Sequence, residues 1–316
     1  MCRKKNGEKL SNRISLIDLE ALAGVNANRN LKNFYKDFQI QYESLSAEQR
    51  DMEILEILKK IHAPLQTVGA HRSKVWEAGW KENVDDYKKS GNKSSLLPKY
   101  FGKTRIFRYM GKLVLGKEKF CDYKLHTVMV DLVLSKYLTK DIKQVHEFGC
   151  GTGLHLDRFA DWVEEDIKLN GYDWTETSGE MIDLINNNSQ KKIRFEQFNF
   201  FRPRKLSKSL KDGVIITCAA LEQVGTDFRM FINFLLDESP SLVIHLEPFS
   251  ELLDENNLLD YLSIQYCSKR NYLKGLLNYL ESLATEGVIE IIERRRLFCG
   301  SRFLEGYPVV VWRVRH

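Results

Sequence analysis

Three glycines, separated by single residues, follow an acidic residue at the end of a short apolar segment. The stretch reads Val145-His146-Glu147-Phe148-Gly149-Cys150-Gly151-Thr152-Gly153. Glycine lets a backbone turn sharply and approach a ligand closely, and an amphipathic helix is predicted to begin directly afterwards, at Leu154. Asp173 ends the next predicted strand, twenty positions after Gly153. A glycine loop followed by such an acid predicts a nucleotide-binding βαβ unit, in which the carboxylate binds ribose hydroxyls.

The glycine spacing does not fit a dinucleotide site. A G-x-G-x-x-G fingerprint counted from Gly149 requires glycine at Leu154, and counted from Gly151 it requires glycine at Leu156. The pattern E-x-G-x-G-x-G instead resembles the first motif of the class I S-adenosylmethionine-dependent methyltransferases. This resemblance implies a Rossmann-like fold, methyltransferase activity and S-adenosylmethionine as the methyl donor. A NAD-dependent oxidoreductase is the less favoured alternative.

This methyl donor requires three kinds of contact. Its methionine end needs a close backbone with polar groups, its ribose needs a carboxylate, and its adenine needs a flat apolar slot. We expect the glycine loop, the carboxylate of the next strand and nearby aromatic rings to supply them; one further residue, Asn199, stands where the family usually binds the adenine amino group. The predicted donor-binding residues are Glu147, Gly149, Cys150, Gly151, Thr152, Gly153, Asp173, Trp174, Asn199, Phe200 and Leu221.

Three candidate bases follow the strands predicted at 213–219 and 241–247. Glu222 follows the first of these strands, and His245 and Glu247 end the second. The carboxyl ends of parallel strands line the ligand crevice, and alternate strand residues share one face. We therefore predict that His245, Glu222 and Glu247 can deprotonate an acceptor hydroxyl. For His245, a buried histidine with satisfied nitrogens is the alternative. No carboxylate cluster has metal-ligand spacing, so no metal is predicted.

The elements that position these residues alternate between strand and helix. Strands are predicted at 144–149, 168–173, 192–198, 213–219, 241–247, 288–295 and 308–315, and helices at 154–165, 177–187, 227–237 and 270–285. The first five strands have the short, apolar character of parallel strands, whereas the last two lack an intervening helix and form an antiparallel pair. We predict an α/β fold with a doubly wound seven-stranded sheet. The family resemblance implies the strand order 3-2-1-4-5-7-6.

Residues 1–120 are predicted to form a helical N-terminal cap on a methyltransferase domain of residues 121–316. The helical periodicity covers Leu16–Ala23, Asn30–Tyr42, Ala47–His62 and Val75–Tyr87. The pattern Trp-Glu-x-Gly-Trp at residues 76–80 resembles the leader of bacterial methyltransferases that modify glycans and small metabolites. We expect the acceptor to bind in this region. The candidate contacts are Tyr100, Arg105, Arg108, Tyr109 and His126, although packing or solvated surface is the favoured role for each.

Positive charge is concentrated in the first part of the chain. Residues 1–140 carry 27 Lys and Arg against 16 Asp and Glu, while the whole chain has a net charge of +5. Such a basic region can attract an anionic substrate or a nucleic acid, although a solvated helical surface is the favoured interpretation. No dense basic run with interleaved aromatic residues appears, so a nucleic-acid partner is not expected. No apolar run approaches a membrane span, and the six scattered cysteines fit a reducing cytoplasm.

The leading hypothesis is a cytoplasmic methyltransferase that modifies a small molecule or a glycan, at oxygen. One alternative is a methyltransferase that acts on nucleic acid or protein; the sequence lacks the Asn/Asp-Pro-Pro-Tyr/Phe motif of base methylation. Another is a non-catalytic S-adenosylmethionine-binding module, which would bind the donor but never convert it to S-adenosylhomocysteine. The sequence does not predict the acceptor or the oligomeric state.

Overall fold

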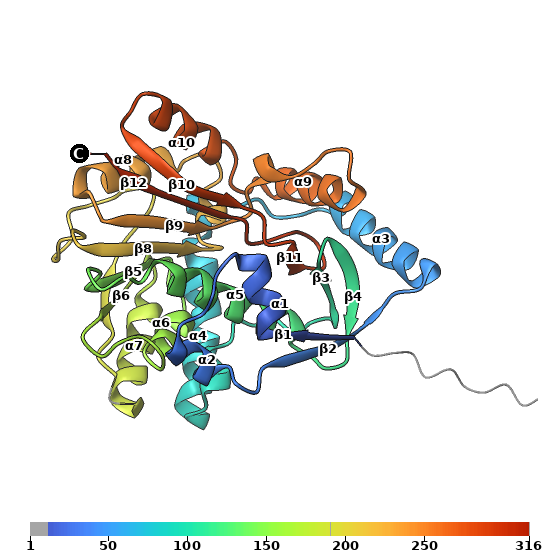
Figure 1. Ribbon diagram of the computed structural model, residues 1–316, viewed down its shortest axis with the longest axis horizontal. Coiled ribbons are helices and arrows are strands. Elements are labelled where there is room, and N and C mark those ends of the chain that lie inside the picture. Colours follow the sequence, from blue (N-terminus) through green and yellow to red (C-terminus); the bar gives the residue numbers. More distant parts are fainter. Residues whose placement is uncertain (1–11, 190, 316) are drawn as a thin grey trace, which may run out of the picture.

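Seven strands from the second half of the chain form one sheet in the computed structural model, which describes residues 12–189 and 191–315 (Figure 1). The order is β10-β12-β9-β8-β5-β6-β7. Neighbours from β9 to β7 are parallel, and β12 pairs antiparallel with both β9 and β10. The predicted order and α/β fold are confirmed. The strands are β5 (Gln144–Phe148), β6 (Lys168–Asp173), β7 (Arg194–Gln197), β8 (Gly213–Cys218), β9 (Leu242–Leu246), β10 (Ile289–Arg295) and β12 (Val309–Val314).

Helices cover both faces of this sheet, and strand alternation divides the core between them. On β8, Val214 and Ile216 belong to one apolar cluster and Ile215 to the other. Every residue of β8 and β9 is buried, as expected for central parallel strands. The first cluster packs on α5 to α7 and the second on α8 and α10. These helices, with α9, are α5 (Cys121–Tyr137), α6 (Leu154–Phe159), α7 (Glu176–Ser189), α8 (Arg229–Glu238), α9 (Leu258–Arg270) and α10 (Leu276–Thr285).

A second, smaller sheet lies in the N-terminal region, in the order β1-β2-β4-β3-β11. The sequence analysis did not predict its strands. They are β1 (Asn12–Ser15), β2 (Gln39–Ser44), β3 (Ile106–Tyr109), β4 (Lys112–Gly116) and β11 (Cys299–Ser301). The accompanying helices are α1 (Leu16–Ala23), α2 (Arg29–Phe34), α3 (Ala47–His62) and α4 (Ser73–Ser90), and the short 3₁₀ segments of the whole chain are η1 (Ala70–Arg72), η2 (Lys93–Leu96), η3 (Leu221–Val224) and η4 (Ser250–Leu252).

The predicted helix over Asn30–Tyr42 is wrong in its second half. The helix α2 ends at Phe34, and residues from Gln39 onward form β2. Ile40 is buried and pairs with Ile14 of β1. Over this short stretch the apolar and polar residues fit a period of two as well as a helical period, so pairing with β1 and β4 decides the conformation.

The N-terminal region and the seven-stranded sheet share one apolar core. Leu19, Leu31 and Phe107 belong to the same cluster as Val128 and Ile216. In addition, β11 comes from the C-terminal part of the chain but pairs antiparallel with β3. The boundary at residue 120 therefore crosses a common core, and independent folding of the two parts stays a prediction. Within the part of the chain that the structure describes, no helix combines the length and apolar character needed to cross a membrane.

Candidate functional site

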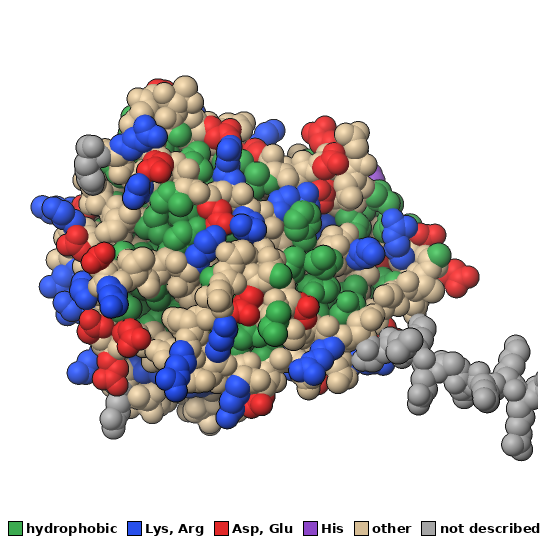
Figure 2. Space-filling model, in the orientation of Figure 1, with side chains coloured by type: hydrophobic (Ala, Val, Ile, Leu, Met, Phe, Trp, Pro, Cys, Tyr) green, Lys and Arg blue, Asp and Glu red, His purple; other side chains and the backbone are tan. Residues whose placement is uncertain are grey.

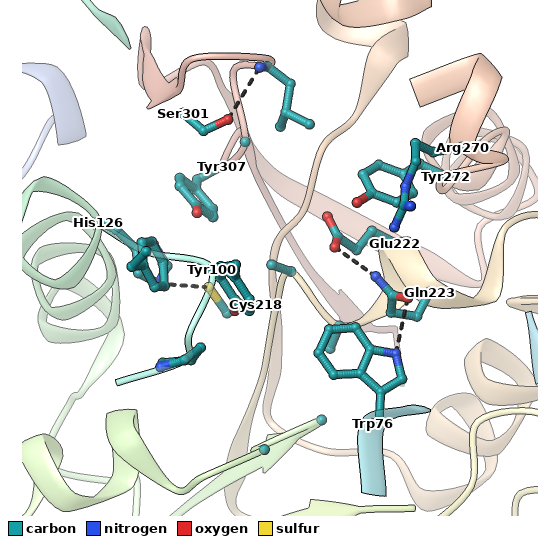
Figure 3. A pocket seen from close by; sticks show the side chains of 18 of the residues that line it. Trp76, Tyr100, His126, Cys218, Glu222, Gln223, Arg270, Tyr272, Ser301 and Tyr307 are labelled. Carbon is teal, nitrogen blue, oxygen red and sulfur yellow. Dashed lines mark hydrogen bonds between the residues drawn. The ribbon is translucent and has the colours of Figure 1, made fainter. Parts of the chain in front are cut away.

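A cavity of about 550 Å³ lies where the carboxyl ends of β5, β6 and β8 face the N-terminal region. The turns after these strands form one side. Most of the rest of the lining comes from α3 to α6, η1, α9 and the segments 98–104 and 301–307, with Leu65 and Tyr272. This is the edge at which doubly wound sheets bind their ligands. Figure 3 shows the side chains that converge on it.

The backbone of the glycine loop requires glycine at each of its three positions. Gly149, Gly151 and Gly153 have φ values of +79°, +54° and +71°. A Cβ on Gly149 would lie 2.3 Å from the Cβ of Ala220, and one on Gly153 would lie 2.4 Å from Ile182. Gly149 and Gly151 line the cavity, together with Cys150 and Thr152. Gly153 does not line it. Instead it precedes the first turn of α6, so its role is to position that helix.

Asp173, at the end of β6, lines the cavity and is 6% exposed. Its Oδ2 accepts the backbone N–H of Gly151 at 3.0 Å, and its Oδ1 accepts both the N–H and the hydroxyl of Thr175, at 3.0 and 2.7 Å. Burial raises the pKa of Asp173, against the effect of these hydrogen bonds. Asp173 thus connects the end of β6 to the glycine loop by a hydrogen bond. The Thr175 hydroxyl also lies 2.7 Å from that of Ser178.

Glu147, 2% exposed at the start of the loop, lines the same cavity. Its Oε1 accepts from Nδ1 of His155 at 2.6 Å, and Nε2 of His155 lies 3.1 Å from Nε2 of His126. Burial lowers the pKa of His126 well below its usual value, so that ring is neutral. The Oε2 of Glu147 is buried and has no hydrogen-bond partner among the described residues. The sequence analysis did not predict His155.

The histidine pair also approaches a thiol. Sγ of Cys218 lies 4.0 Å from Nε2 of His126, and possible ligand atoms of His126, His155 and Cys218 all lie within 4.8 Å of one another. This cluster could not be predicted from the sequence, because its members are distant in the chain. His155 donates from Nδ1 to Glu147, so its Nε2 accepts from Nε2 of His126, while Nδ1 of His126 has no hydrogen-bond partner among the described residues.

Aromatic rings lie together beside the end of β6, and this group is called the aromatic slot. Trp174 and Phe201 stack with ring centroids 5.9 Å apart and an interplanar angle of 25°, and both line the cavity with Phe200. Asn199 does not line it. Its Oδ1 accepts the N–H of Phe201 at 2.9 Å, so this side chain supports a turn.

The prediction that Leu221 contacts the donor is wrong. Leu221 is fully buried in the apolar cluster around β8 and α8, and it does not line the cavity. Only its backbone N–H takes part in the site, because it donates to Glu247 at 3.0 Å.

Glu222 is the one predicted base that lines the cavity within the described residues. Its Oε1 accepts from Nε2 of Gln223 at 2.8 Å, and Oε1 of Gln223 accepts from the indole N–H of Trp76 at 3.3 Å (Figure 3). Burial, together with the negative charge of Glu247, raises the pKa of Glu222 to about 8. Two side chains thus hold Glu222 in place, and near neutral pH it exchanges a proton readily.

The prediction that Glu247 reaches the acceptor is wrong. Glu247 is 0% exposed and does not line the cavity. Its carboxylate accepts the backbone N–H groups of Ala220, Leu221 and Glu222 at 3.0 to 3.1 Å. Burial raises its pKa to about 7 in spite of these bonds. Glu247 therefore holds the η3 turn that carries Glu222.

The prediction that His245 faces the cavity is also wrong. His245 is 0% exposed, and it does not line the cavity. Its Nε2 accepts the indole N–H of Trp312 at 3.1 Å, and its Nδ1 lies 2.9 Å from Oγ1 of Thr217. Burial lowers its pKa to about 3. The ring is neutral and satisfied between β8 and β12, because this strand residue points into the protein layer.

The predicted acceptor contacts of the N-terminal region divide in two. Tyr100 and His126 line the cavity, whereas Arg105, Arg108 and Tyr109 do not. Arg108 is buried and donates to the carbonyls of Leu259 and Phe303, at 2.9 and 3.0 Å, so it has a structural role. Further side chains that sequence reasoning missed also line the cavity: Arg72, Trp76, Trp80, Tyr266, Arg270, Tyr272 and Tyr307.

Two of these missed contacts, Trp76 and Trp80, had a sequence signal. Trp76 and Trp80 are four residues apart, so they share one face of α4, and their ring centroids lie 5.1 Å apart. A Cβ on Gly151 would lie 2.9 Å from the Trp80 ring, so this ring covers the glycine loop. In addition, the hydroxyl of Thr152 donates to the carbonyl of Leu96 at 2.6 Å. The N-terminal region is thus fastened directly onto the loop.

No family model matches the chain, and no curated protein matches its sequence. Similar solved structures include an O-methyltransferase of neocarzinostatin biosynthesis bound to S-adenosylmethionine and 2-hydroxy-5-methyl naphthoic acid (13% identity, 85% of this chain, 70% of that chain, TM-score 0.45). Others are PigF with SAH (11%, 83% and 68%, TM-score 0.41) and a SAM-dependent methyltransferase from Aquifex aeolicus (12%, 56% and 85%, TM-score 0.38).

Proposed function

We propose that this protein is an S-adenosylmethionine-dependent methyltransferase that acts on a hydroxyl of a small molecule or a glycan. One observation carries the proposal. The glycine loop, Asp173 and Glu222 line one cavity, together with residues of the N-terminal region. Such a cavity accommodates a donor and an acceptor together, and this proximity supplies most of the acceleration in methyl transfer.

The residues that line the cavity near the glycine loop fit the donor. Gly149 and Gly151 line the cavity without a side chain, which would permit close approach of the methionine end. The unpartnered Oε2 of Glu147 is an acceptor for the ammonium group. Asp173 would bind the ribose hydroxyls, and the slot of Trp174, Phe200 and Phe201 would hold the adenine. The bound donor would supply an electrophilic methyl group on its sulfonium sulfur.

Glu222 is the proposed base. It follows β8, next to the edge where the loop after β5 and the carboxylate at the end of β6 would bind the two ends of the donor. A carboxylate with a pKa of about 8 is a far stronger base than an ordinary glutamate, and it accepts a proton from a hydroxyl as the oxygen attacks. Gln223 and Trp76 orient it, and Glu247 fixes the backbone beneath it.

The test has two steps with the full chain. Calorimetry with S-adenosylhomocysteine and with NADH, separately, examines the donor site; we expect binding of the first and none of the second. Methyl-labelled S-adenosylmethionine is then incubated with a fractionated small-molecule extract, and S-adenosylhomocysteine and labelled products are detected by mass spectrometry.

The Glu222→Gln variant is the matched control, because it keeps the shape of the side chain but cannot act as a base. Labelled product from the wild type and none above background from the variant is the expected result. Tight NADH binding without S-adenosylhomocysteine binding would refute the proposal. Donor binding without conversion in any fraction would favour a non-catalytic binding module.

A further inference from the structure

Among the described residues, four acidic and five basic side chains line the cavity, and Asp122 and Glu222 are among the acids. At the glycine loop the charged side chains are the acids Glu147 and Asp173. Toward the opposite end, the cavity is lined by basic side chains of the N-terminal region, α9 and the segment after β11. They are Lys60, Arg72, Lys103, Arg270 and Arg302. Arg302 is ion-paired with Glu53, and within the described part of the chain the other four form no ion pair.

Arg72, Arg270 and Arg302 are partly buried, whereas Lys60 and Lys103 are exposed; of the three arginines, only Arg302 is ion-paired within the described residues. The N–H of Val68 donates to the carbonyl of Arg270 at 3.0 Å, which joins the segment before η1 to the end of α9. The guanidinium carbon of Arg72 lies 5.8 Å from the Trp76 ring centroid, and that of Arg270 lies 5.2 Å from the Tyr272 centroid. Figure 3 shows Arg270 and Tyr272 on the same side of the cavity as Glu222. The two guanidinium groups therefore stand at fixed positions beside flat rings.

Donor groups of both arginines are left without acceptors. Nε and Nη1 of Arg72 and Nε of Arg270 are buried, and they have no hydrogen-bond partner among the described residues. Buried N–H groups are rarely left unpaired, because each one forfeits its hydrogen bonds to water. Unpaired guanidinium donors in a cavity wall point to a ligand that accepts hydrogen bonds.

Glu222 does not neutralise this end. It makes no ion pair with either arginine in the described structure, and its Oε1 accepts from Gln223. Its pKa is raised to about 8, so much of it is protonated near neutral pH. Burial lowers the pKa of Arg72, and the nearby charge of Arg270 lowers it further. The pair therefore carries an excess of positive charge in a region where charge is poorly screened.

We propose that Arg72 and Arg270 bind an oxyanion on the methyl acceptor, either a carboxylate or a phosphate monoester. The proposal rests on the proposed function, and it names the acceptor class. A guanidinium presents its N–H groups in a planar fork that matches both anions. Trp76, Tyr266 and Tyr272 place flat apolar surface beside the pair, which suits an acceptor with a ring next to its anionic group. The acids at the loop face the cationic donor, so charge directs each substrate to its own end.

The location of these cations favours a small anion over a nucleic acid. They lie in a cavity wall, whereas on the face shown in Figure 2 basic and acidic side chains are interspersed, without a large basic area. Some of the positive charge of residues 1–140 thus lies in the cavity wall, at Lys60, Arg72 and Lys103.

The test uses the full chain saturated with S-adenosylhomocysteine, at constant ionic strength. Calorimetry or ligand-observed NMR measures the affinities of benzoate, benzamide and inorganic phosphate. Benzamide has nearly the shape of benzoate without its charge. We expect saturable binding of at least one anion, with benzoate or phosphate favoured over benzamide by about tenfold or more, since hydrogen bonds to charged groups contribute about 1.5–3 kcal/mol each. Preference for benzoate identifies a carboxylate, and preference for phosphate identifies a phosphate monoester.

The double variant Arg72→Gln/Arg270→Gln should lose this preference while it keeps its S-adenosylhomocysteine affinity. The control is Arg229→Gln, because Arg229 also lies over a tyrosine ring, at 4.3 Å from Tyr279, but does not line the cavity. Wild-type protein that binds neither anion, or binds benzamide as well as benzoate, overturns the proposal without any variant. Failure of S-adenosylhomocysteine to bind would instead refute the donor site.

Discussion

The two ends of the cavity are built in different ways. The end proposed to bind the donor, here the donor end, is formed by turns of the seven-stranded sheet, mainly through backbone groups and the carboxylates of Glu147 and Asp173. The end proposed to bind the acceptor, here the acceptor end, is formed by α3, η1, α4, α9 and the segment after β11, through side chains such as Arg72 and Arg270. The backbone conformation of the loops determines the shape of the donor end, whereas the identity of the side chains determines the chemistry of the acceptor end. Substitutions should therefore separate donor affinity from turnover.

The largest expected effect lies at the acceptor end. Glu222→Gln should lower turnover by about 10²–10⁴-fold and leave the affinity for S-adenosylhomocysteine unchanged, because the side chain keeps its shape but loses its basicity. In the wild type, the active form is the ionised one, so kcat/KM should rise with pH up to about 8 and then level off. Steady-state kinetics between pH 6 and 10 checks both points. A variant with wild-type turnover would show that the acceptor needs no base here.

The next largest effect is expected at the backbone of the donor end. Gly149→Val places a β-branched residue at a φ of +79°, with its Cβ 2.3 Å from Ala220. Left-handed strain costs about 1–2 kcal/mol and overpacking about 1–3 kcal/mol, so donor affinity should fall by at least roughly 30-fold. Calorimetry with S-adenosylhomocysteine measures this fall. Gly287→Val is the control, since Gly287 has a φ of +80° with open space around it, outside the cavity. Equal affinities in both variants would contradict the role of the loop.

Asp173→Ala tests the side-chain contribution to the donor end. It removes the ribose acceptor and also the bond that ties Gly151 to β6, so donor binding should weaken by about 1–3 kcal/mol, or roughly 5- to 150-fold. The variant should remain folded by circular dichroism, because a carboxylate at the cavity wall contributes little to the apolar core. Asp183→Ala, on the exposed face of α7, is the matched control. Unchanged donor affinity would exclude Asp173 from the site.

The smallest effect on activity is expected from a residue that belongs to neither end. His245→Gln should change turnover per folded molecule by less than about threefold, because the ring is enclosed between Thr217 and Trp312. The substitution should instead lower the free energy of unfolding by about 1–3 kcal/mol, since the buried partners lose a hydrogen bond. Denaturant unfolding and active-site titration separate these two quantities. A hundredfold loss of turnover in a fully folded variant would restore His245 as a catalytic candidate.

Most residues predicted for the donor site line the cavity, because their sequence signals are local. The glycine spacing, the acid after the next strand and the alternation of strands and helices all depend on short stretches, whereas the strand order of the main sheet was implied by the family resemblance. Where prediction failed, the side chain had a more favourable partner within the protein. Asn199 bonds the N–H of Phe201, and Glu247 binds the three N–H groups of the η3 turn. Strand-end position alone does not distinguish these roles.

The acceptor end could not be predicted in the same way. Arg72 and Arg270 are nearly 200 positions apart, and they meet because α9 packs against α3 and the segment before η1. The burial of Arg108 could not be foreseen either, since its partners are the carbonyls of Leu259 and Phe303. Contacts of this kind depend on the tertiary fold, and composition only hinted at them through the basic character of residues 1–140.

The pairing of β11 with β3 has a consequence for the synthesis of the protein. The strands β1 to β4 all lie before residue 117, but their sheet is completed by residues 299–301. On the ribosome, the edge of β3 therefore stays unpaired until residues 299–301 have been translated. Exposed strand edges invite pairing with other chains, and contacts between distant residues form slowly. Until β11 has been made, the nascent N-terminal segment is therefore exposed to aggregation, and chaperones should protect it during this time.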